Sequence, residues 1–298
     1  MKNKIVIILM IVLLISCSTD KDLSDAYGNF EVTEVIVSAE ANGEILELDL
    51  EEGQIIKANQ LVGKIDSVSL VLKKEQIKET IKAIKSKLEN FTAQIKVQEQ
   101  LKMNVLKEKN RVEAMLKDGA ATSKQFDDID GNLNVIEKQI NSILTQQKSV
   151  KSEISAYEKQ CDQINENIKN CQIINPVNGT ILTKMAEKGE ITAFGKPLYK
   201  IADLSQLQLK VYISGNQLAK AKLGDEVVVL IDDGNDGLKQ LSGKISWISA
   251  KAEFTPKTIQ TKAERVNLVY AMKVNTKNDG TLKIGMPGEI RFRPNINQ

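Results

Sequence analysis

The sequence contains no histidine, and this absence limits the chemistry that its other side chains could carry out. Histidine is the side chain that titrates closest to neutral pH, and it is the commonest ligand of transition metals in proteins. A Ser-His-Asp or Cys-His catalytic site is therefore impossible in this chain. The remaining candidates for chemistry are short motifs that contain Lys, Asp, Gly or Cys.

Two of these motifs match ligand-binding loops only in part. Residues 189–197, GEITAFGKP, resemble a phosphate-binding loop, but the glycines are one residue too far apart and Pro197 replaces the required Ser or Thr. The acidic run 127–130 has part of the spacing of a calcium-binding EF-hand loop, but Phe126 stands at the first ligand position. We therefore expect no nucleotide or metal site, and we expect a helix to run through the acidic residues.

A third motif, AMKV at Ala271–Val274, is similar to the sequence at which biotin is attached to carrier domains. Such a carrier needs its lysine at an exposed hairpin that joins two repeated β motifs. In this chain a long helical insertion is expected at that junction, and Lys273 falls in a later strand. The sequence therefore predicts no biotin or lipoate at Lys273 or Lys184, and no other cofactor.

Cys17 follows a segment that is typical of a secretion signal. Two lysines precede eleven unbroken apolar residues, Ile5–Ile15, and this run is shorter than the ~20 residues that a membrane-spanning helix needs. We interpret residues 1–17 as a signal peptide. Its end, LISC, resembles a bacterial lipobox, which predicts acylation of Cys17 and residues 18–29 as a polar tether. An ordinary secretory signal with an incidental cysteine is the alternative.

Charge and the other cysteines exclude further classes. The 41 basic and 39 acidic residues nearly balance, so nucleic acid is not an expected partner. Cys161 and Cys171 lie ten residues apart on one expected helix, about 15 Å, which is too far for a disulfide. We expect both thiols to pack as small apolar groups.

A short β-type pattern occurs twice, 136 positions apart. One copy, ANGEILELDLEEGQI, begins at Ala41, and the other, VNGTILTKMAEKGEI, begins at Val177. The matched residues include Asn42 with Asn178, Gly53 with Gly189, and Ile55 with Ile191. Neither copy could bury a core alone, so residues 40–68 and 173–204 are expected to close on each other into one β domain.

Residues 69–172 are patterned as a long antiparallel helical hairpin. In the second arm apolar residues recur at alternating steps of three and four residues, with Gln147 as the single polar exception, at Phe126, Ile129, Leu133, Ile136, Ile140, Ile143, Val150, Ile154, Tyr157, Cys161, Ile164, Ile168 and Cys171. This spacing is the signature of a left-handed coiled coil. The first arm has Ile77, Ile81, Ile84, Leu88, Phe91 and Ile95, and then Leu101, Val105, Val112 and Met115. A register slip of one residue after Ile95 predicts a local change of winding.

The two arms are expected to meet at residues 116–123. Asp118-Gly119 favours a turn, and Thr122 or Ser123 can cap the returning helix. Arms of roughly 45 residues, at ~1.5 Å per residue, predict a projection of about 65 to 70 Å. That length favours a spacer with a contact surface far from its base.

From residue 205 to 298, short alternating segments separated by Gly, Asp and Asn predict a small antiparallel β-barrel. Residues 30–39 have the pattern of a further strand, which we expect to join the barrel. The expected fold is therefore an elongated α+β chain, in which a coiled-coil hairpin is inserted in a split lipoyl-like (biotinyl-like) β domain and a β-barrel follows.

The order of lipobox, split β repeat, inserted hairpin and trailing β domain resembles the membrane fusion proteins, or periplasmic adaptors, of the hemolysin-secretion D (HlyD) family. Residues 252–274 are more specifically similar to adaptors that partner ABC-type exporters. The resemblance implies an adaptor and not an enzyme. It also implies a periplasmic hexamer anchored at the inner membrane, which surrounds a transporter and presents its hairpin tips to a TolC-like outer-membrane channel.

The tip motif of that family is an Arg, a Leu four residues later and a Ser seven residues after that. The matching positions here hold Arg111, Met115 and Thr122. Arg111 matches, Met115 keeps an apolar side chain of similar volume, and Thr122 keeps a hydroxyl. The resemblance therefore implies that these three residues dock the channel.

Two functions follow from these observations. The first is an adaptor that couples an inner-membrane exporter to an outer-membrane channel. The alternative is a lipid-anchored envelope scaffold that uses its hairpin to bind a partner without a role in transport. The exported substrate is not indicated by any motif.

Overall fold

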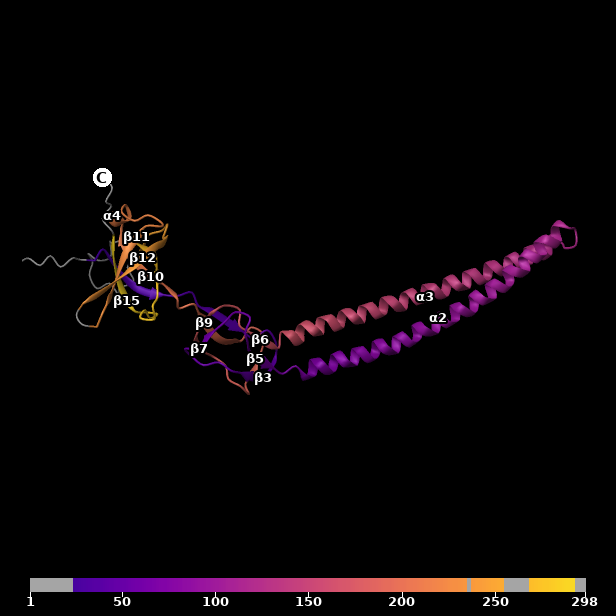
Figure 1. The fold of residues 1–298 in the computed structure, drawn as a ribbon, viewed down its shortest axis with the longest axis horizontal. Helices are drawn as coiled ribbons and strands as arrows, with labels where there is room; N and C mark the ends of the chain where they lie inside the picture. The colour runs from indigo at the N-terminus through magenta and orange to yellow at the C-terminus, as the bar shows by residue number, and fades with distance from the viewer. Residues whose placement is uncertain (1–23, 235–236, 255–267, 293–298) are drawn as a thin grey trace, which may run out of the picture.

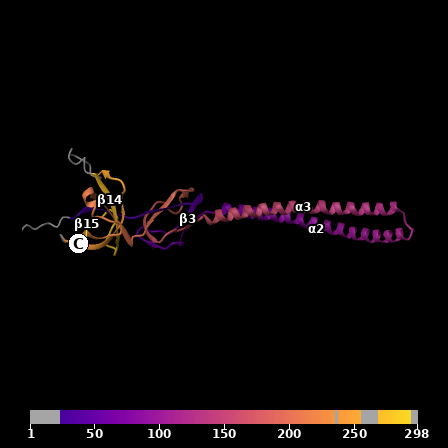
Figure 2. The same cartoon turned by 90° about the horizontal axis from the view of Figure 1, so that it is seen from above.

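The computed structural model describes residues 24–234, 237–254 and 268–292. The chain is elongated, with a β-barrel at one end, a smaller β sandwich in the middle and a helical hairpin that projects from the sandwich (Figures 1 and 2). This arrangement confirms the expected α+β fold. Cys17 and the rest of the expected signal peptide lie outside the described residues.

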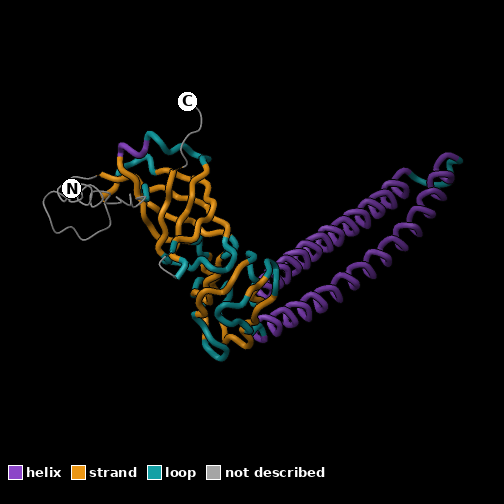
Figure 3. Tube along the Cα trace, turned by 60° about the vertical axis from the view of Figure 1, so that its left-hand side comes forward, coloured by secondary structure: helices purple, strands orange, loops and turns teal. Residues whose placement is uncertain are grey.

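The hairpin consists of α2, Val68–Lys117, and α3, Ser123–Lys169, with 50 and 47 residues. At ~1.5 Å per residue these helices project about 70 to 75 Å. Figure 3 shows both helices leaving the same end of the sandwich. The acidic run 127–130 lies within α3, as the sequence predicts.

The coiled-coil seam of α2 runs without interruption, so the expected register slip is wrong. After Ile95 the residues turned toward α3 continue at steps of three and four, and they are Gln98, Lys102, Val105, Lys109, Val112 and Leu116. Leu101 and Met115, which we expected in the seam, are 45% and 41% exposed. The error arose because polar side chains occupy true seam positions while apolar ones lie on the outer face.

The polar seam residues find partners across the hairpin. Lys102 Nζ lies 2.7 Å from Glu137 Oε1, Lys109 forms an ion pair with Asp130, and Gln147 donates to Thr92 Oγ1 at 3.1 Å. The hydrogen bond to Asp130 raises the pKa of Lys109. Half-exposed pairs of this kind contribute little stability, about 0 to 1 kcal/mol each, but they fix the register of the two helices.

Near the base the seam is apolar. Ile81, Ile84 and Ile154 form a buried cluster, against which Cys161 packs. Cys171, which we expected as the last seam position of the helix, instead lies beyond the end of α3 and packs in the core of the sandwich. It is 1% exposed, and burial raises the pKa of its thiol. Both cysteines are free, as expected.

The sandwich is built from both repeat copies. One sheet has the order β2-β9-β7-β4 and the other the order β6-β5-β3-β8. The strands are β2 Val35–Ser38, β3 Gly43–Leu48, β4 Ile55–Ile56, β5 Leu61–Ile65, β6 Gln172–Ile174, β7 Gly179–Lys184, β8 Ile191–Thr192 and β9 Pro197–Ala202. Each sheet therefore contains strands from both sides of the hairpin.

The two copies exchange equivalent hydrogen bonds. Gly53 N donates to Ile181 O at 2.8 Å, and the matched Gly189 N donates to Ile45 O at 2.8 Å. The side chain of Asn178 accepts from Ala58 N at 2.9 Å, and that of Asn42 accepts from Phe194 N at 2.8 Å. Because every bond in these pairs crosses between the copies, neither copy is complete without the other.

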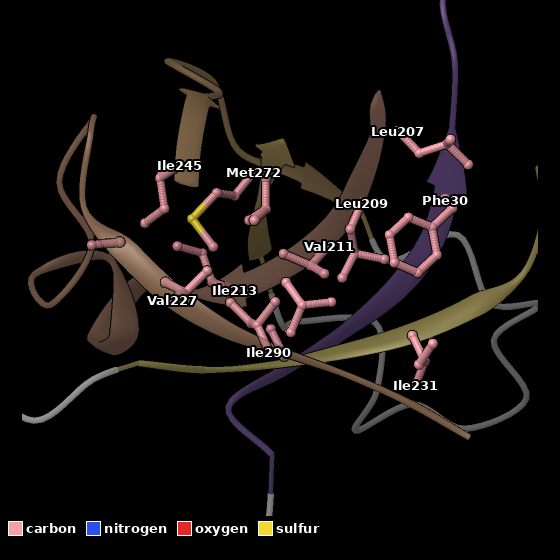
Figure 4. Packing of buried hydrophobic residues seen from close by; sticks show 14 of the residues in the cluster. Phe30, Leu207, Leu209, Val211, Ile213, Val227, Ile231, Ile245, Met272 and Ile290 are labelled. Carbon is pink, nitrogen blue, oxygen red and sulfur yellow. The ribbon is translucent and has the colours of Figure 1, made fainter. Parts of the chain in front are cut away.

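The barrel closes because β10, Gln206–Ser214, pairs with both β1, Ala26–Glu31, and β14, Leu268–Lys277. The ring is completed by β15, Pro287–Phe292, β11, Glu226–Asp232, and β12, Leu238–Ile248, while β13, Glu253–Phe254, extends β14. A short helix, α4, Gly215–Leu218, follows β10. Figure 4 shows side chains from several strands, including Phe30, Val211 and Ile290, meeting in one core.

The segment expected as one strand at residues 30–39 is two strands in different domains. β1 begins at Ala26 and pairs in the barrel, whereas β2 pairs with β9 in the sandwich. The expected tether at residues 18–29 is correspondingly too long, because its last four residues belong to β1. The apolar and polar residues alternate through this segment as they do in a strand. Nothing in that alternation shows that one strand ends at Glu31 and another begins at Val35.

Candidate functional site

The hairpin tip is shaped by the end of α2 and the start of α3. The first helix ends at Lys117, and Gly119 follows with a φ of +76°, a conformation that favours glycine. Ala120 N donates to Met115 O at 2.7 Å, which folds the turn back on the helix. The tip is thus a short ordered turn and not a long loop.

Thr122 begins α3 as its N-cap. Its hydroxyl oxygen accepts from Gln125 N at 3.3 Å, while Gln125 Oε1 accepts from Thr122 N at 2.8 Å. This reciprocal capping box satisfies two backbone donors that a helix start leaves unpaired. The cap was expected from the sequence, and it gives the hydroxyl of Thr122 a structural partner within its own chain.

Arg111 and Met115 lie one turn apart on the exposed side of α2. Arg111 NH1 lies 3.1 Å from Glu108 Oε2, and the Arg111 side chain is 70% exposed. This pair within one helix is weak, so the guanidinium remains available to another acceptor. The structure therefore brings Arg111 and Met115 together on one face, with Thr122 at the beginning of the opposite arm.

The base of the hairpin contains a polar network that sequence reasoning missed. Asn175 is fully buried, and its amide donates to Lys57 O at 2.8 Å and to Val177 O at 2.5 Å. Its carbonyl accepts from the hydroxyl of Tyr199 at 3.1 Å, and burial raises the pKa of Tyr199 to about 12. No repeat match marks Asn175, because the equivalent position in the first copy is Ala39.

The two lysines that were considered as biotin or lipoate attachment residues, Lys273 and Lys184, lie in strands of the β domains. Lys273 is in β14, where its Nζ lies 6.0 Å from the ring centroid of Trp247. Lys184 is in β7, with its Nζ 2.6 Å from Glu187 Oε2. The junction of the two repeat copies carries the hairpin, so neither lysine has the position of a swinging-arm attachment site.

Within the described residues no group of three or more Cys, Asp or Glu side chains is arranged to hold a metal ion. Of the helices in the same part of the chain, none combines the length and the apolar content needed to cross a bilayer. The candidate site is therefore the exposed tip of the hairpin, which the two long helices hold far from the β sandwich.

Comparison with known proteins gives the chain its relatives. Residues 33–204 match the barrel-sandwich hybrid domain of RND membrane fusion proteins (RND MFP). A UPF0194 membrane protein of Yersinia enterocolitica is 24% identical over 327 residues, covering 98% of each chain. A UPF0194 membrane protein of Enterobacter sp. (strain 638) is also 24% identical, with the same coverage.

Two solved structures share the fold. MacA from Actinobacillus actinomycetemcomitans superposes with a TM-score of 0.59 at 21% identity, covering 90% of this chain and 78% of that one. The membrane fusion protein Spr0693 from Streptococcus pneumoniae R6 superposes with a TM-score of 0.53 at 16% identity, covering 90% and 98%. These likenesses extend beyond the matched domain to most of the chain.

Proposed function

Because this chain belongs to the family of RND-type membrane fusion proteins, we propose that it is a periplasmic adaptor that couples an inner-membrane exporter to an outer-membrane channel. The observation that carries the proposal is the exposed tip at the end of two helices of 50 and 47 residues. A projection of about 70 Å has no use in closing the β domains, but it suits a protein that must reach across a compartment. The work is mechanical, and the energy for export comes from the transporter.

The finer identity of the partners follows from the sequence resemblance. The likeness to HlyD-type adaptors, and of residues 252–274 to those that partner ABC-type exporters, supports an ABC-type transporter at the barrel end. The tip residues Arg111, Met115 and Thr122 support a TolC-like channel at the other end. As in the family, the adaptor works as a homo-oligomer, with a hexamer as the expected form.

The anchor of the proposed adaptor is an acyl chain on Cys17, in the inner membrane. A Cys17→Ala variant is expected to lose acyl label completely and to fractionate with soluble periplasmic proteins, because one or more lipid chains are its means of anchorage. The measurement is metabolic labelling with palmitate, followed by fractionation. A Cys161→Ala variant is the matched control and should keep both label and membrane association. Unchanged membrane association of Cys17→Ala would contradict the lipobox.

The docking of the tip is tested by charge reversal at Arg111. With a photocrosslinker at Lys117 in intact cells, Arg111→Asp should lower the yield of adduct with an outer-membrane channel by about tenfold or more, since a reversed charge at a contact repels its partner. Export by the cognate transporter should fall with it. The control is Lys159→Asp. The native Lys159 side chain is 79% exposed and pairs with Asp162, far from the tip.

Both variants should keep the helical circular dichroism of the hairpin, because each loses only an exposed ion pair. If Arg111→Asp exports normally and still forms the channel adduct, tip docking through Arg111 is wrong. If the adduct contains an envelope protein other than a channel, and deletion of the chain leaves export intact, the protein is the lipid-anchored scaffold instead.

A further inference from the structure

The outer wall of the barrel carries a cluster of lysines around Asn275 of β14. Along this strand Val274 and Thr276 are buried, so Lys273, Asn275 and Lys277 alternate with them on the outer face. At about 3.3 Å per residue, the Cα atom of each of these lysines is about 7 Å from that of Asn275. The asparagine therefore lies between two positive charges on its own strand.

Each neighbouring strand adds one more lysine to this cluster. Lys244 of β12 is the register partner of Asn275, and Lys210 of β10 is the register partner of Lys273. Side chains paired in this way have Cβ atoms about 4.5 to 5.5 Å apart, and like charges directly opposite each other destabilise a sheet. The opposition of Lys210 and Lys273 therefore has a cost in stability, which a bound anion would offset.

The acidic side chains nearest to the lysine cluster lie at its edges. Glu31 of β1 is the register partner of Gln208, Glu226 of β11 is that of Lys244, and Glu253 lies in β13. Four lysines and three glutamates leave this face with an excess of positive charge. Because the glutamates are on outer strands, the excess is concentrated around Asn275.

A groove of ≈ 670 Å³ opens beside the cluster. It is lined mainly by polar side chains, among them Gln206, Ser242, Lys244, Ser246, Asn275 and Lys277. A volume of this size accommodates a small ligand. The Oδ1 atom of Asn275 is buried and accepts no hydrogen bond from any residue that the structure describes. Since a buried oxygen without a donor costs free energy, the groove offers an acceptor for a ligand hydroxyl close to several positive charges.

The groove lies at the end of the barrel that adjoins the sandwich (Figure 1). Gln206 begins β10 four residues after β9 ends at Ala202, and Lys277 is its register partner at the end of β14. The chain enters the barrel at the other end, where Tyr27 pairs with Tyr212, six residues or about 20 Å further along β10. With the proposed anchor at Cys17, the membrane lies at that other end, so the groove is reached from solution.

We propose that this groove binds a soluble ligand that combines a phosphate group with hydroxyl groups, of which a sugar phosphate is the simplest class. Lys244 and Lys277 bind the phosphate, because several flexible ammonium groups can approach one anion that carries about two negative charges. The amide of Asn275 supplies both an acceptor and donors to the neighbouring hydroxyls. The inference goes beyond the proposed adaptor function, since neither the hairpin tip nor a partner protein takes part in this binding.

Calorimetric titration of the full-length chain, purified in detergent, tests the site with glucose 6-phosphate as the probe. The dissociation constant should be about 1 mM or lower, and binding should weaken as salt is added, because salt screens exposed charges. Glucose, which lacks the phosphate, and inorganic phosphate, which lacks the sugar hydroxyls, should each bind at least about tenfold more weakly. Binding of glucose as tight as that of glucose 6-phosphate would overturn the proposal.

Replacement of single lysines locates the bound phosphate. Lys244→Gln and Lys277→Gln should each weaken glucose 6-phosphate binding about tenfold, because each removes one charge-assisted hydrogen bond. The control is Lys188→Gln, which changes an exposed lysine of the sandwich and should leave the affinity as it is. The fluorescence of Trp247 during urea unfolding checks that the barrel of each variant is folded. Equal affinity in the three variants would place the ligand elsewhere.

Asn275→Ala separates recognition of the hydroxyls from recognition of the phosphate. It should weaken binding of glucose 6-phosphate about fivefold and leave binding of inorganic phosphate unchanged, because the amide contacts only the sugar. Equal losses for both probes would contradict a contact between Asn275 and a hydroxyl.

Vesicles of phosphatidylglycerol distinguish a soluble ligand from a lipid headgroup of the same chemistry. Flotation with these vesicles should not differ between the parent chain and Lys244→Gln. Flotation that depends on Lys244, without binding of glucose 6-phosphate, would assign the groove to the membrane and overturn the proposal. Arg111→Asp should bind glucose 6-phosphate normally, so a failure of tip docking is distinguished from a failure of this site.

Discussion

Replacement of Gly28 by valine is expected to unfold the barrel while the hairpin stays helical. Gly28 lies in β1, where it pairs with Val211 of β10 and Gly288 of β15. A Cβ at Gly28 would overlap the carbonyl of Lys210. Because that obstacle is backbone, β1 would have to separate from β10, and the fully buried Phe30 would leave the core. We expect a loss of about 4 kcal/mol or more, at the upper end of single-residue effects.

The two parts of the molecule can be followed separately. Trp247 is the single tryptophan and lies in β12, so its fluorescence reports the barrel, while circular dichroism at helical wavelengths reports the hairpin. Gly28→Val should abolish the cooperative fluorescence transition in urea and keep most of the helical signal. Asn29→Val, an exposed change in the same strand, is the control and should shift the transition little. A normal fluorescence transition in Gly28→Val would show that the strands can accommodate the side chain.

The overall fold could be predicted because its determinants are periodic. The repeat at Ala41 and Val177 predicts one shared domain, and the heptads of α3 predict the hairpin, since both patterns extend over many residues. Turn chemistry at Gly119 and Thr122 located the tip correctly for the same reason, because each residue type has a local physical role. These features need no knowledge of distant contacts.

Sequence reasoning failed on α2, where polar residues occupy the seam and apolar residues lie on the exposed face. On α2, Lys102 and Lys109 occupy the seam because Glu137 and Asp130 meet them there. Leu101 and Met115, by contrast, lie on the outer face. If every apolar residue is assigned to the seam, the exposed Leu101 and Met115 are counted together with the true seam residues. The seam then seems to shift by one residue. The apparent slip therefore arose from mixing exposed positions with seam positions, and the two can be told apart only when contacts fix the register.

The candidate site was predictable only in part. Arg111 and Met115 could be located from a motif, and the local residue types left Thr122 and Ser123 as the two candidates for the cap of α3, of which the structure selects Thr122. The buried network at the base was not predictable, because Asn175 has no periodic or repeated neighbour that would identify it. Its partners, Lys57 and Tyr199, come from separate segments of the folded chain.

Asn175→Ala is expected to loosen the base from which the hairpin projects. The substitution removes three side-chain hydrogen bonds and leaves the hydroxyl of Tyr199 and the carbonyl of Val177 without their partner, while the carbonyl of Lys57 still accepts from Gln60 N. Buried groups left unpaired in this way cost about 1 to 3 kcal/mol each when water cannot replace the partner, so we expect a total loss of about 3 kcal/mol. The backbone of Asn175 also bonds to Asn59 and Gln60, which ties the returning chain to the first repeat copy.

Hydrogen exchange measured by mass spectrometry can locate this effect. In Asn175→Ala the amides of residues 57–61 and 172–178 should exchange about 100-fold faster than in the parent chain, which corresponds to the loss of about 3 kcal/mol in local stability. Tyr199→Phe is the graded control. It removes one hydroxyl and should cost about 1 kcal/mol, a roughly fivefold change. Equal exchange in the two variants would mean that the Asn175 amide contributes nothing beyond its bond to Tyr199. In that case the stiffness of the hairpin base would have to come from the interlocked strands alone.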